Sequence, residues 1–98
     1  MRFLSWLGVG ASAQRPSSLI FLNDMRSYSE TKHCVSFWGF DGSFEIAFDL
    51  PEGKLYRLSP HDGDETSILR VFDQHRPEIE LMAGAAHRNS SQRHHLLS

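Results

Sequence analysis

Residues 34–50 read CVSFWGFDGSFEIAFDL, two stretches of alternating side chains that meet at Asp41-Gly42. Asp-Gly is a favoured two-residue β-turn because both residues tolerate the positive φ angles that such a turn requires. The sequence therefore predicts a β-hairpin with strands at Cys34–Phe40 and Ser43–Leu50.

An Asp41-Gly42 turn sets the expected cross-strand pairs: Val35 with Phe48, Phe37 with Ile46, Gly39 with Phe44, Trp38 with Glu45 and Cys34 with Asp49. Residues that pair directly share a face of the sheet. One face is then almost wholly apolar and carries Val35, Phe37, Phe44, Ile46 and Phe48. The opposite face carries Ser36, Trp38, Glu45, Ala47 and Asp49. A slip of one residue would move the whole apolar set to solvent, so the turn and the pattern support each other.

Shorter elements are expected on both sides of the hairpin. Leu19–Leu22 is an apolar run ended by Asn23-Asp24, which indicates a buried strand and a turn. Met25–His33 is polar and has no clear period, so we expect a loop there. Lys54–Leu58 fits either a third strand or a short helical turn, because five residues cannot separate the two.

Beyond Ser67 the apolar residues recur at three- and four-residue steps, which is typical of a helix with one buried stripe. Pro77 interrupts this stripe, because proline lacks a main-chain donor and disfavours helical geometry in the residue before it. We therefore expect C-terminal helices at Ser67–Gln74 and Pro77–His87, broken or kinked at Pro77.

The segments that flank the helices are polar. Ser59–Glu65 contains proline, glycine and three acids and is predicted to be an exposed loop, with Asp64 or Thr66 as the helix cap. His95–Leu97 is a candidate for a last edge strand. The elements together predict an α+β fold, in which a small antiparallel sheet built around the hairpin packs against the C-terminal helices.

Composition narrows the possible functions. The 98 residues suit one domain, and no apolar run approaches the ~20 residues of a membrane span. Ten basic against twelve acidic residues give a net charge of −2, which argues against a nucleic-acid binder with a basic surface. The single cysteine excludes an intrachain disulfide.

The first eighteen residues differ from the rest, since Met1–Ser18 contains two arginines, no acid and a Gly/Ala/Ser-rich stretch. We expect a disordered N-terminal extension here, with residues 19–98 as a single small α+β domain of a cytoplasmic protein. The alternative is an exported protein, in which Met1–Ala13 is a short signal with an A-x-A cleavage site at Ala11–Ala13.

Two groups of residues form a pattern seen in a known family. The first group is Arg26-Ser27-Tyr28, Cys34-Val35, Phe37-Trp38-Gly39-Phe40-Asp41-Gly42 and Glu45-Ile46. The second group is Leu69, Phe72-Asp73, His75-Arg76 and Ile79-Glu80. Together they resemble a family of short bacterial proteins classed as domain of unknown function 1488, over Leu19 to Leu97. The resemblance implies a sheet backed by C-terminal helices, and it brings no activity, substrate or catalytic residue.

Candidate catalytic and metal sites are few. His33-Cys34 and His94-His95 are adjacent pairs, and neighbouring strand residues point to opposite faces, so neither pair suits the closely spaced ligands of zinc. The expected neighbour of Cys34 is a carboxylate, which disfavours a thiolate nucleophile. We therefore expect no enzymatic activity, no metal and no cofactor.

The remaining candidates form an interaction surface made of Trp38, Glu45 and Arg76. A tryptophan on a mostly polar face is typical of an interface anchor, although a covering helix would make Trp38 part of the core. Arg76 lies beside the helix break, where it either contacts a partner or bridges to neighbouring carboxylates.

The expected function is a non-catalytic protein–protein interaction or accessory domain, which acts by self-association or with an unknown protein partner. A nucleic-acid-associated regulator is the alternative, and it requires the fold to cluster several arginines. These are Arg57, Arg70, Arg76, Arg88 and Arg93.

Overall fold

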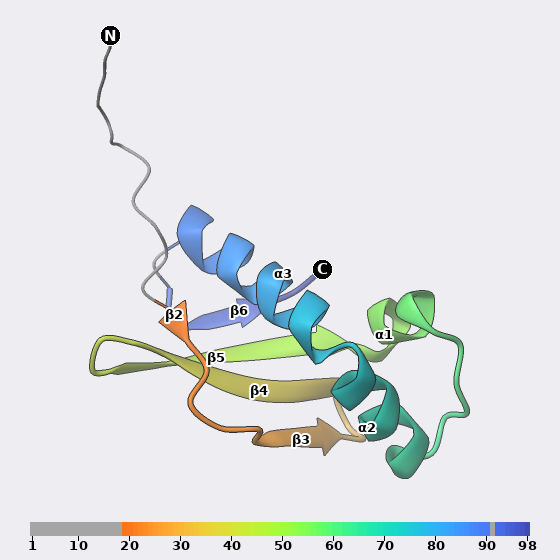
Figure 1. Cartoon of the computed structure of the whole chain (residues 1–98). Coiled ribbons are helices and arrows are strands. Elements are labelled where there is room, and N and C mark those ends of the chain that lie inside the picture. The colour runs from red at the N-terminus through yellow and green to blue at the C-terminus, as the bar shows by residue number, and fades with distance from the viewer. Residues whose placement is uncertain (1–18, 91) are drawn as a thin grey trace, which may run out of the picture.

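The computed structural model describes residues 19–90 and 92–98, so the expected N-terminal extension and signal segment lie outside the described residues. The elements in chain order are β2 (Leu19–Ile20), β3 (Arg26–Ser29), β4 (Cys34–Asp41), β5 (Phe44–Pro51), α1 (Glu52–Leu58), α2 (Glu65–Gln74), α3 (Arg76–Asn89) and β6 (His94–Leu96) (Figure 1). Five strands form one sheet in the order β2-β4-β5-β6, and β3 pairs with the other end of β4. The predicted α+β fold, with its hairpin and C-terminal helices, is confirmed.

The predicted hairpin register is wrong by two residues. Phe37 pairs with Phe48, and Asp41 pairs with Phe44 instead of lying in the turn. The two-residue loop is therefore Gly42-Ser43, in which Gly42 has a φ of 63° and Ser43 is not among the residues with positive φ. Such a loop needs glycine only at its first position, as type II′ hairpin turns do. A shift of two residues preserves both faces of the strands, so the predicted assignment of faces still holds.

The hydrophobic core lies between one face of the sheet and the helices. Phe37 and Phe48 stack across the hairpin with ring centroids 5.2 Å apart, and Phe72 of α2 meets Phe37 edge-on at 5.3 Å. The core residues are Val35, Phe37, Ile46, Phe48, Leu50, Leu55, Ile68, Val71, Phe72, Ile79, Ala83 and Leu97. Phe44, which was expected to join them, is 51% exposed because it lies at the hairpin tip. The apolar face of the hairpin is thus the surface that binds the helices.

The N-terminal segment forms an interrupted edge strand along β4. β2 is shorter than the predicted strand at Leu19–Leu22, and the loop predicted for Met25–His33 is wrong because β3 forms within it. β3 pairs with β4 from Arg26 to Ser29, and its Tyr28 packs against the core. The Arg26 guanidinium also donates two 2.9 Å hydrogen bonds to the Asp73 carboxylate on α2. These contacts join residues far apart in the chain, which periodicity alone does not reveal.

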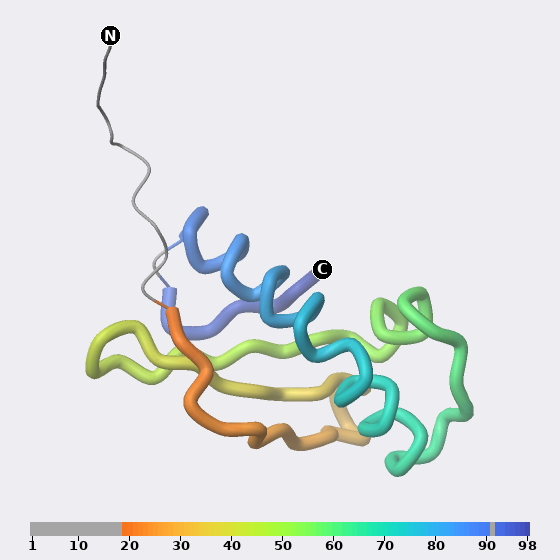
Figure 2. The backbone as a smooth tube through the Cα atoms, in the orientation of Figure 1, coloured from red at the N-terminus to blue at the C-terminus, as the bar shows by residue number. Residues whose placement is uncertain are grey.

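The helical layer follows the predicted breaks. Lys54–Leu58 is helical as part of α1, and the Asp64 carboxylate accepts a 3.0 Å hydrogen bond from the Ser67 main-chain N–H at the start of α2. Pro77 lies in the first turn of α3, where proline costs no helical hydrogen bond. The helices are therefore separate, and the break falls at His75. Figure 2 shows how the chain changes direction there before α3 runs back across the sheet.

The chain closes the sheet with β6, which pairs with β5 in parallel and places Phe48 opposite His95. The predicted strand at His95–Leu97 therefore forms, one residue earlier than expected, and it makes the sheet mixed. A parallel pair requires a long crossover, and α1, α2 and α3 supply it. None of the helices within residues 19–90 and 92–98 has the length and apolar character that a bilayer span requires.

Candidate functional site

The sheet has a helix-free face, which we define by the strand residues that point away from the core. Its apolar members are Ile20, Trp38, Phe40, Ala47 and Leu96, and its polar members are Ser36, Glu45, Asp49 and His94. Ile20 and Leu96 are 52% and 66% exposed, while Trp38 and Phe40 are half-buried. Apolar side chains from four strands therefore lie on a face that no core residue of the helices covers.

Trp38 and Glu45 share this helix-free face, but they are not the direct cross-strand partners that the sequence predicted. Trp38 pairs with Ala47, and Glu45 pairs with Phe40, as the two-residue shift of register requires. Glu45 is exposed.

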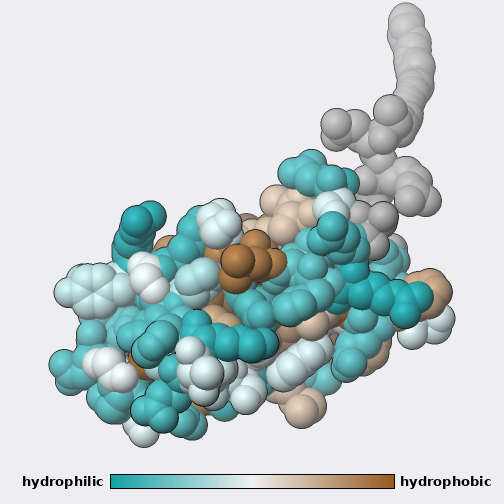
Figure 3. Space-filling model, turned by 180° about the vertical axis from the view of Figure 1, so that it is seen from behind, coloured by the Kyte–Doolittle hydropathy of each residue, from teal (hydrophilic) through white to brown (hydrophobic). Residues whose placement is uncertain are grey.

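Seen from behind, most of the molecular surface is hydrophilic, with one small strongly hydrophobic patch near its middle (Figure 3).

Arg76 lies on the helix side of the sheet, away from Trp38. Its Nε donates to Glu80 at 2.9 Å, and its Nη2 donates to the main-chain oxygen of Asn23 at 3.2 Å. The guanidinium carbon also lies 5.3 Å from the ring centre of Phe72, and only 11% of the side chain is exposed. The structure therefore brings two of the three predicted site residues together and uses the third to join α3 to the loop after β2.

A hydroxyl, a carboxylate and an imidazole line up on the helix-free face. The Ser36 hydroxyl donates to Asp49 Oδ1 at 2.6 Å, and His94 Nε2 lies 2.7 Å from Asp49 Oδ2. Burial by itself would raise the pKa of Asp49, but the hydrogen bonds from Ser36 and His94 outweigh it and the net pKa is lowered. The order of groups differs from a catalytic triad, in which the imidazole lies between the hydroxyl and the carboxylate. The array therefore ties β4, β5 and β6 together and does not activate Ser36.

A second array joins α3 to the sheet on the helix side. His87 Nε2 lies 2.7 Å from Asp41 Oδ2, and His87 Nδ1 lies 3.1 Å from Nε2 of His95. His95 is buried and stacks on Phe48 at 5.3 Å. Burial lowers the pKa of His95, and the neighbouring His87 lowers it further. The neutral form of His95 is thus favoured, which suits an imidazole enclosed between a helix and a strand.

Cys34 is buried at the start of β4. It pairs with Pro51 and not with Asp49 as expected, although the Asp49 carboxylate still acts on it. Burial raises the pKa of the Cys34 thiol, and the Asp49 charge raises it further. In the part of the chain that the structure describes, no group of three or more histidine, cysteine or carboxylate residues could hold a metal ion.

The arginines of the nucleic-acid alternative are spread over the helical layer and the segment before β6. Arg57 is on α1, Arg70 on α2, and Arg76 and Arg88 at opposite ends of α3. Arg93 lies with its guanidinium carbon 4.2 Å from the ring centre of Phe44.

Sequence reasoning missed both imidazole arrays. Ser36 and Asp49 are direct cross-strand partners in the true register. A predicted turn at Gly42-Ser43, in place of Asp41-Gly42, would therefore have paired them. His94 and His87 reach their carboxylates across more than forty residues of chain, and no spacing rule connects them. Only the closing strand and α3, once packed, bring these groups into contact.

Comparisons with known proteins give one family. Neither the curated proteins nor the solved structures contain a match to this chain. The family model described as "Protein of unknown function (DUF1488)" matches residues 19–96, which include all eight helices and strands of the structure. The predicted resemblance is confirmed, and the chain belongs to the DUF1488 family.

Proposed function

We propose that this protein is a non-catalytic interaction domain that self-associates, with the helix-free face of one copy packed on the same face of a second copy. The observation that carries the proposal is the half-buried Trp38 on the central strand β4, on the same face as exposed Ile20 on β2 and exposed Leu96 on β6. Large apolar side chains on an uncovered sheet face lose water when another surface covers them, and tryptophan is enriched at the centres of such contacts.

The charges of the helix-free face favour a second copy as the occupant. A symmetric dimer places the same patch on both sides, so the patch must complement itself. Glu45 on β5 carries a negative charge, and His94 on β6 offers an imidazole that is 59% exposed. Two-fold packing can set Glu45 of each copy near His94 of the other, and the net charge of −2 gives little repulsion between copies.

The size of the face predicts weak association. Strands of eight residues are about 27 Å long, and four strands side by side are about 19 Å wide. Because β2 and β6 are much shorter than the eight-residue strands, the flat area is at most about 500 Å², smaller than the ~800 Å² that each partner buries in a standard stable complex. We therefore expect a dimer that forms at roughly micromolar concentrations or above and dissociates on dilution.

The non-catalytic part of the proposal rests on the Asp49 array, in which Asp49 is hydrogen-bonded to Ser36 and His94. The hydroxyl of Ser36 donates to a carboxylate whose pKa is lowered, and such a carboxylate is a weak base. The buried Cys34, whose thiol pKa is raised, offers little thiolate.

Sedimentation velocity over a wide range of protein concentrations tests the dimer. The wild-type protein should shift from monomer to dimer as concentration rises, and Trp38→Ala should move the midpoint to at least about tenfold higher concentration. Leu81→Ala is the matched control, because Leu81 is 75% exposed on α3 and lies outside the helix-free face. A wild-type protein that stays monomeric, or equal shifts for the two variants, would contradict the proposal. Circular dichroism should show that both variants are folded.

A further inference from the structure

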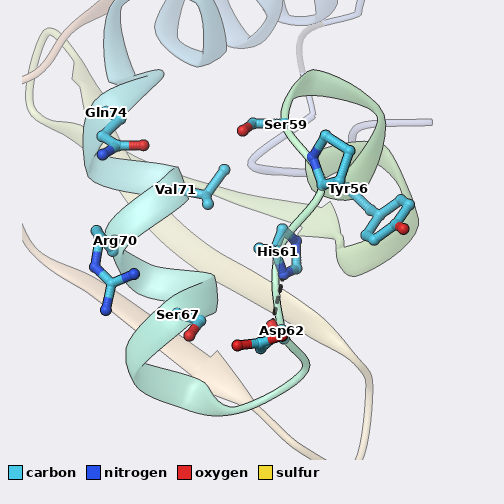
Figure 4. A pocket seen from close by; sticks show the side chains of 9 residues that line it. Tyr56, Ser59, His61, Asp62, Ser67, Arg70, Val71 and Gln74 are labelled. Carbon is cyan, nitrogen blue, oxygen red and sulfur yellow. Dashed lines mark hydrogen bonds between the residues drawn. The ribbon is translucent and has the colours of Figure 1, made fainter.

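A pocket of about 520 Å³ lies between the loop that follows α1 and one side of α2. Its lining residues are Tyr56, Ser59, Pro60, His61, Asp62, Ser67, Arg70, Val71 and Gln74. Figure 4 shows His61 on the loop facing α2, which carries Arg70 and Val71 on the opposite wall. The volume is within the ~300–1,000 Å³ range of small-molecule sites.

His61 has an unsatisfied nitrogen in this pocket. Its Nδ1 lies 2.7 Å from the main-chain oxygen of Asp62, so Nδ1 carries the proton and donates it (Figure 4, dashed line). In the neutral imidazole, Nε2 is then an acceptor. Nε2 is buried, and among residues 19–90 and 92–98 it has no hydrogen-bond partner. Buried polar groups are normally paired, so this atom needs a donor that the described residues do not supply.

The pocket also presents one charge of each sign. Arg70 on α2 and Asp62 on the loop are both exposed, and neither forms an ion pair within the described part of the chain. A free phosphate would suit Arg70 but not Asp62, nor the nearby acids Asp64 and Glu65 at the start of α2. A ligand with both a carboxylate and an ammonium group fits the two charges together.

The remaining lining is mixed: Ser59, Ser67 and Gln74 are polar, and Pro60 and Val71 supply apolar surface. The Tyr56 ring meets the imidazole of His61 edge-on at 5.5 Å. We propose that the pocket binds a free amino acid with an apolar side chain: its carboxylate on Arg70, its ammonium group on Asp62 and His61 Nε2, and its side chain between Pro60 and Val71. The ammonium group then supplies the donor that Nε2 lacks.

The test is a titration of the ¹⁵N-labelled protein, followed by amide chemical shifts, with four probes. L-Phenylalanine carries both charges, 3-phenylpropionate only the carboxylate, 2-phenylethylamine only the ammonium group, and inorganic phosphate only negative charge. L-Phenylalanine should shift the amides of residues 59–62 and of α2 with saturation, and each other probe should bind at least about tenfold more weakly.

Two variants assign the contacts. Arg70→Gln should weaken L-phenylalanine binding by about tenfold and leave 2-phenylethylamine unchanged, whereas Asp62→Asn should weaken L-phenylalanine and leave 3-phenylpropionate unchanged. Arg57→Gln and Glu65→Gln are matched controls on charges outside the pocket, and neither should change the binding.

Three outcomes overturn the proposal. L-Phenylalanine that causes no saturable shift up to about 50 mM excludes an amino-acid site, since such affinity is negligible. Tighter binding of phosphate than of L-phenylalanine makes the pocket an anion site. Equal losses in the control variants show a general charge effect. Trp38→Ala should leave the titration unchanged, so this result is independent of the proposed dimer.

Discussion

A single missing side chain at residue 39 lets the edge strand approach the hairpin. A Cβ built on Gly39 would lie 2.9 Å from the Leu19 side chain, 3.0 Å from the Phe21 ring and 3.1 Å from the main-chain oxygen of Ile20. The side chains can move, but the Ile20 oxygen belongs to β2, which pairs with β4. Glycine is therefore needed here for close backbone approach and not for an unusual φ angle.

Gly39→Ala should lower the free energy of unfolding by about 1–3 kcal/mol, because the new methyl group displaces β2. Gly53→Ala is the matched control, since a Cβ at Gly53 meets nothing within 4 Å and the residue lies in α1. That control should stabilise the protein by up to about 1 kcal/mol through helix propensity. Urea unfolding followed by circular dichroism measures both, and two changes of the same sign would refute this account.

Protonation of His95 links one residue to the pH dependence of stability. Its pKa in the folded protein is below the ordinary value of 6.5, first because of burial and second because of His87. Between the folded pKa and 6.5 the unfolded chain binds more protons, so stability should fall as pH drops below about 6.5. The Asp41 carboxylate lies 2.7 Å from His87, and the charge of His94 also lowers the pKa of His95.

His95→Phe should flatten the change in unfolding free energy between about pH 7 and pH 5, because it removes this titration and keeps a ring against Phe48. The control is His33→Gln, at a side chain that is 73% exposed. It should leave the dependence of unfolding free energy on pH as in the wild-type protein. Thermal unfolding across this pH range measures the slopes, and an unchanged slope in His95→Phe would show that another group is responsible.

At the scale of elements, α2 and α3 each owe their start to a local signal. Asp64 accepts hydrogen bonds from both the main-chain N–H and the hydroxyl of Ser67, and these bonds lower its pKa. Pro77 opens α3 after the break at His75. Both signals were readable in the sequence because capping and proline effects act within one turn of helix.

Asp64→Ala should destabilise the protein by about 1 kcal/mol through loss of the α2 cap. Asp62→Ala removes a neighbouring exposed acid that caps nothing and should change stability by less than about 0.5 kcal/mol. Chemical unfolding of the two variants separates the contribution of the helix cap from that of the loop charge. Equal losses of stability in both variants would assign the effect to charge.

At the scale of the whole molecule, the strands differ in how many residues they pair with a neighbouring strand. β4 and β5 pair over eight residue positions each and form the centre of the core, whereas β2 has two residues and β6 three. Short edge strands open locally at lower cost than a central pair. The edge strands β2 and β6 should therefore open before the β4–β5 hairpin unfolds.

Amide hydrogen exchange checks this order. The central amides of β4 and β5 should exchange only through global unfolding, while Ile20 and Leu96 exchange at least about tenfold faster through local opening. The Leu97 N–H donates to the Asp49 main-chain oxygen at 2.9 Å, so its exchange rate should lie between those of the two groups. Equal protection of β6 and β4 would show that the sheet unfolds as one unit.

The sequence by itself determined the hairpin, the division of its residues between two faces, and a break or kink of the C-terminal helices at Pro77. These follow from local rules: a period of two along a strand, a period of 3.6 along a helix, and the missing donor of Pro77. The polar strand β3 was not predictable in this way, because it has no apolar period and its contacts with α2 and the core join residues far apart in the chain.

Only the tertiary structure decided the register, the parallel pairing of β6, and the groups that meet across the chain. A two-residue slip leaves every side chain on the same face, so alternation could not separate the Asp41-Gly42 turn from Gly42-Ser43. Stacking of Phe37 on Phe48 accompanies the true register. The Asp49 array arises where distant segments pack, and the pocket beside His61 where α1, its following loop and α2 pack. Packing depends on shape in three dimensions that no period along the chain records.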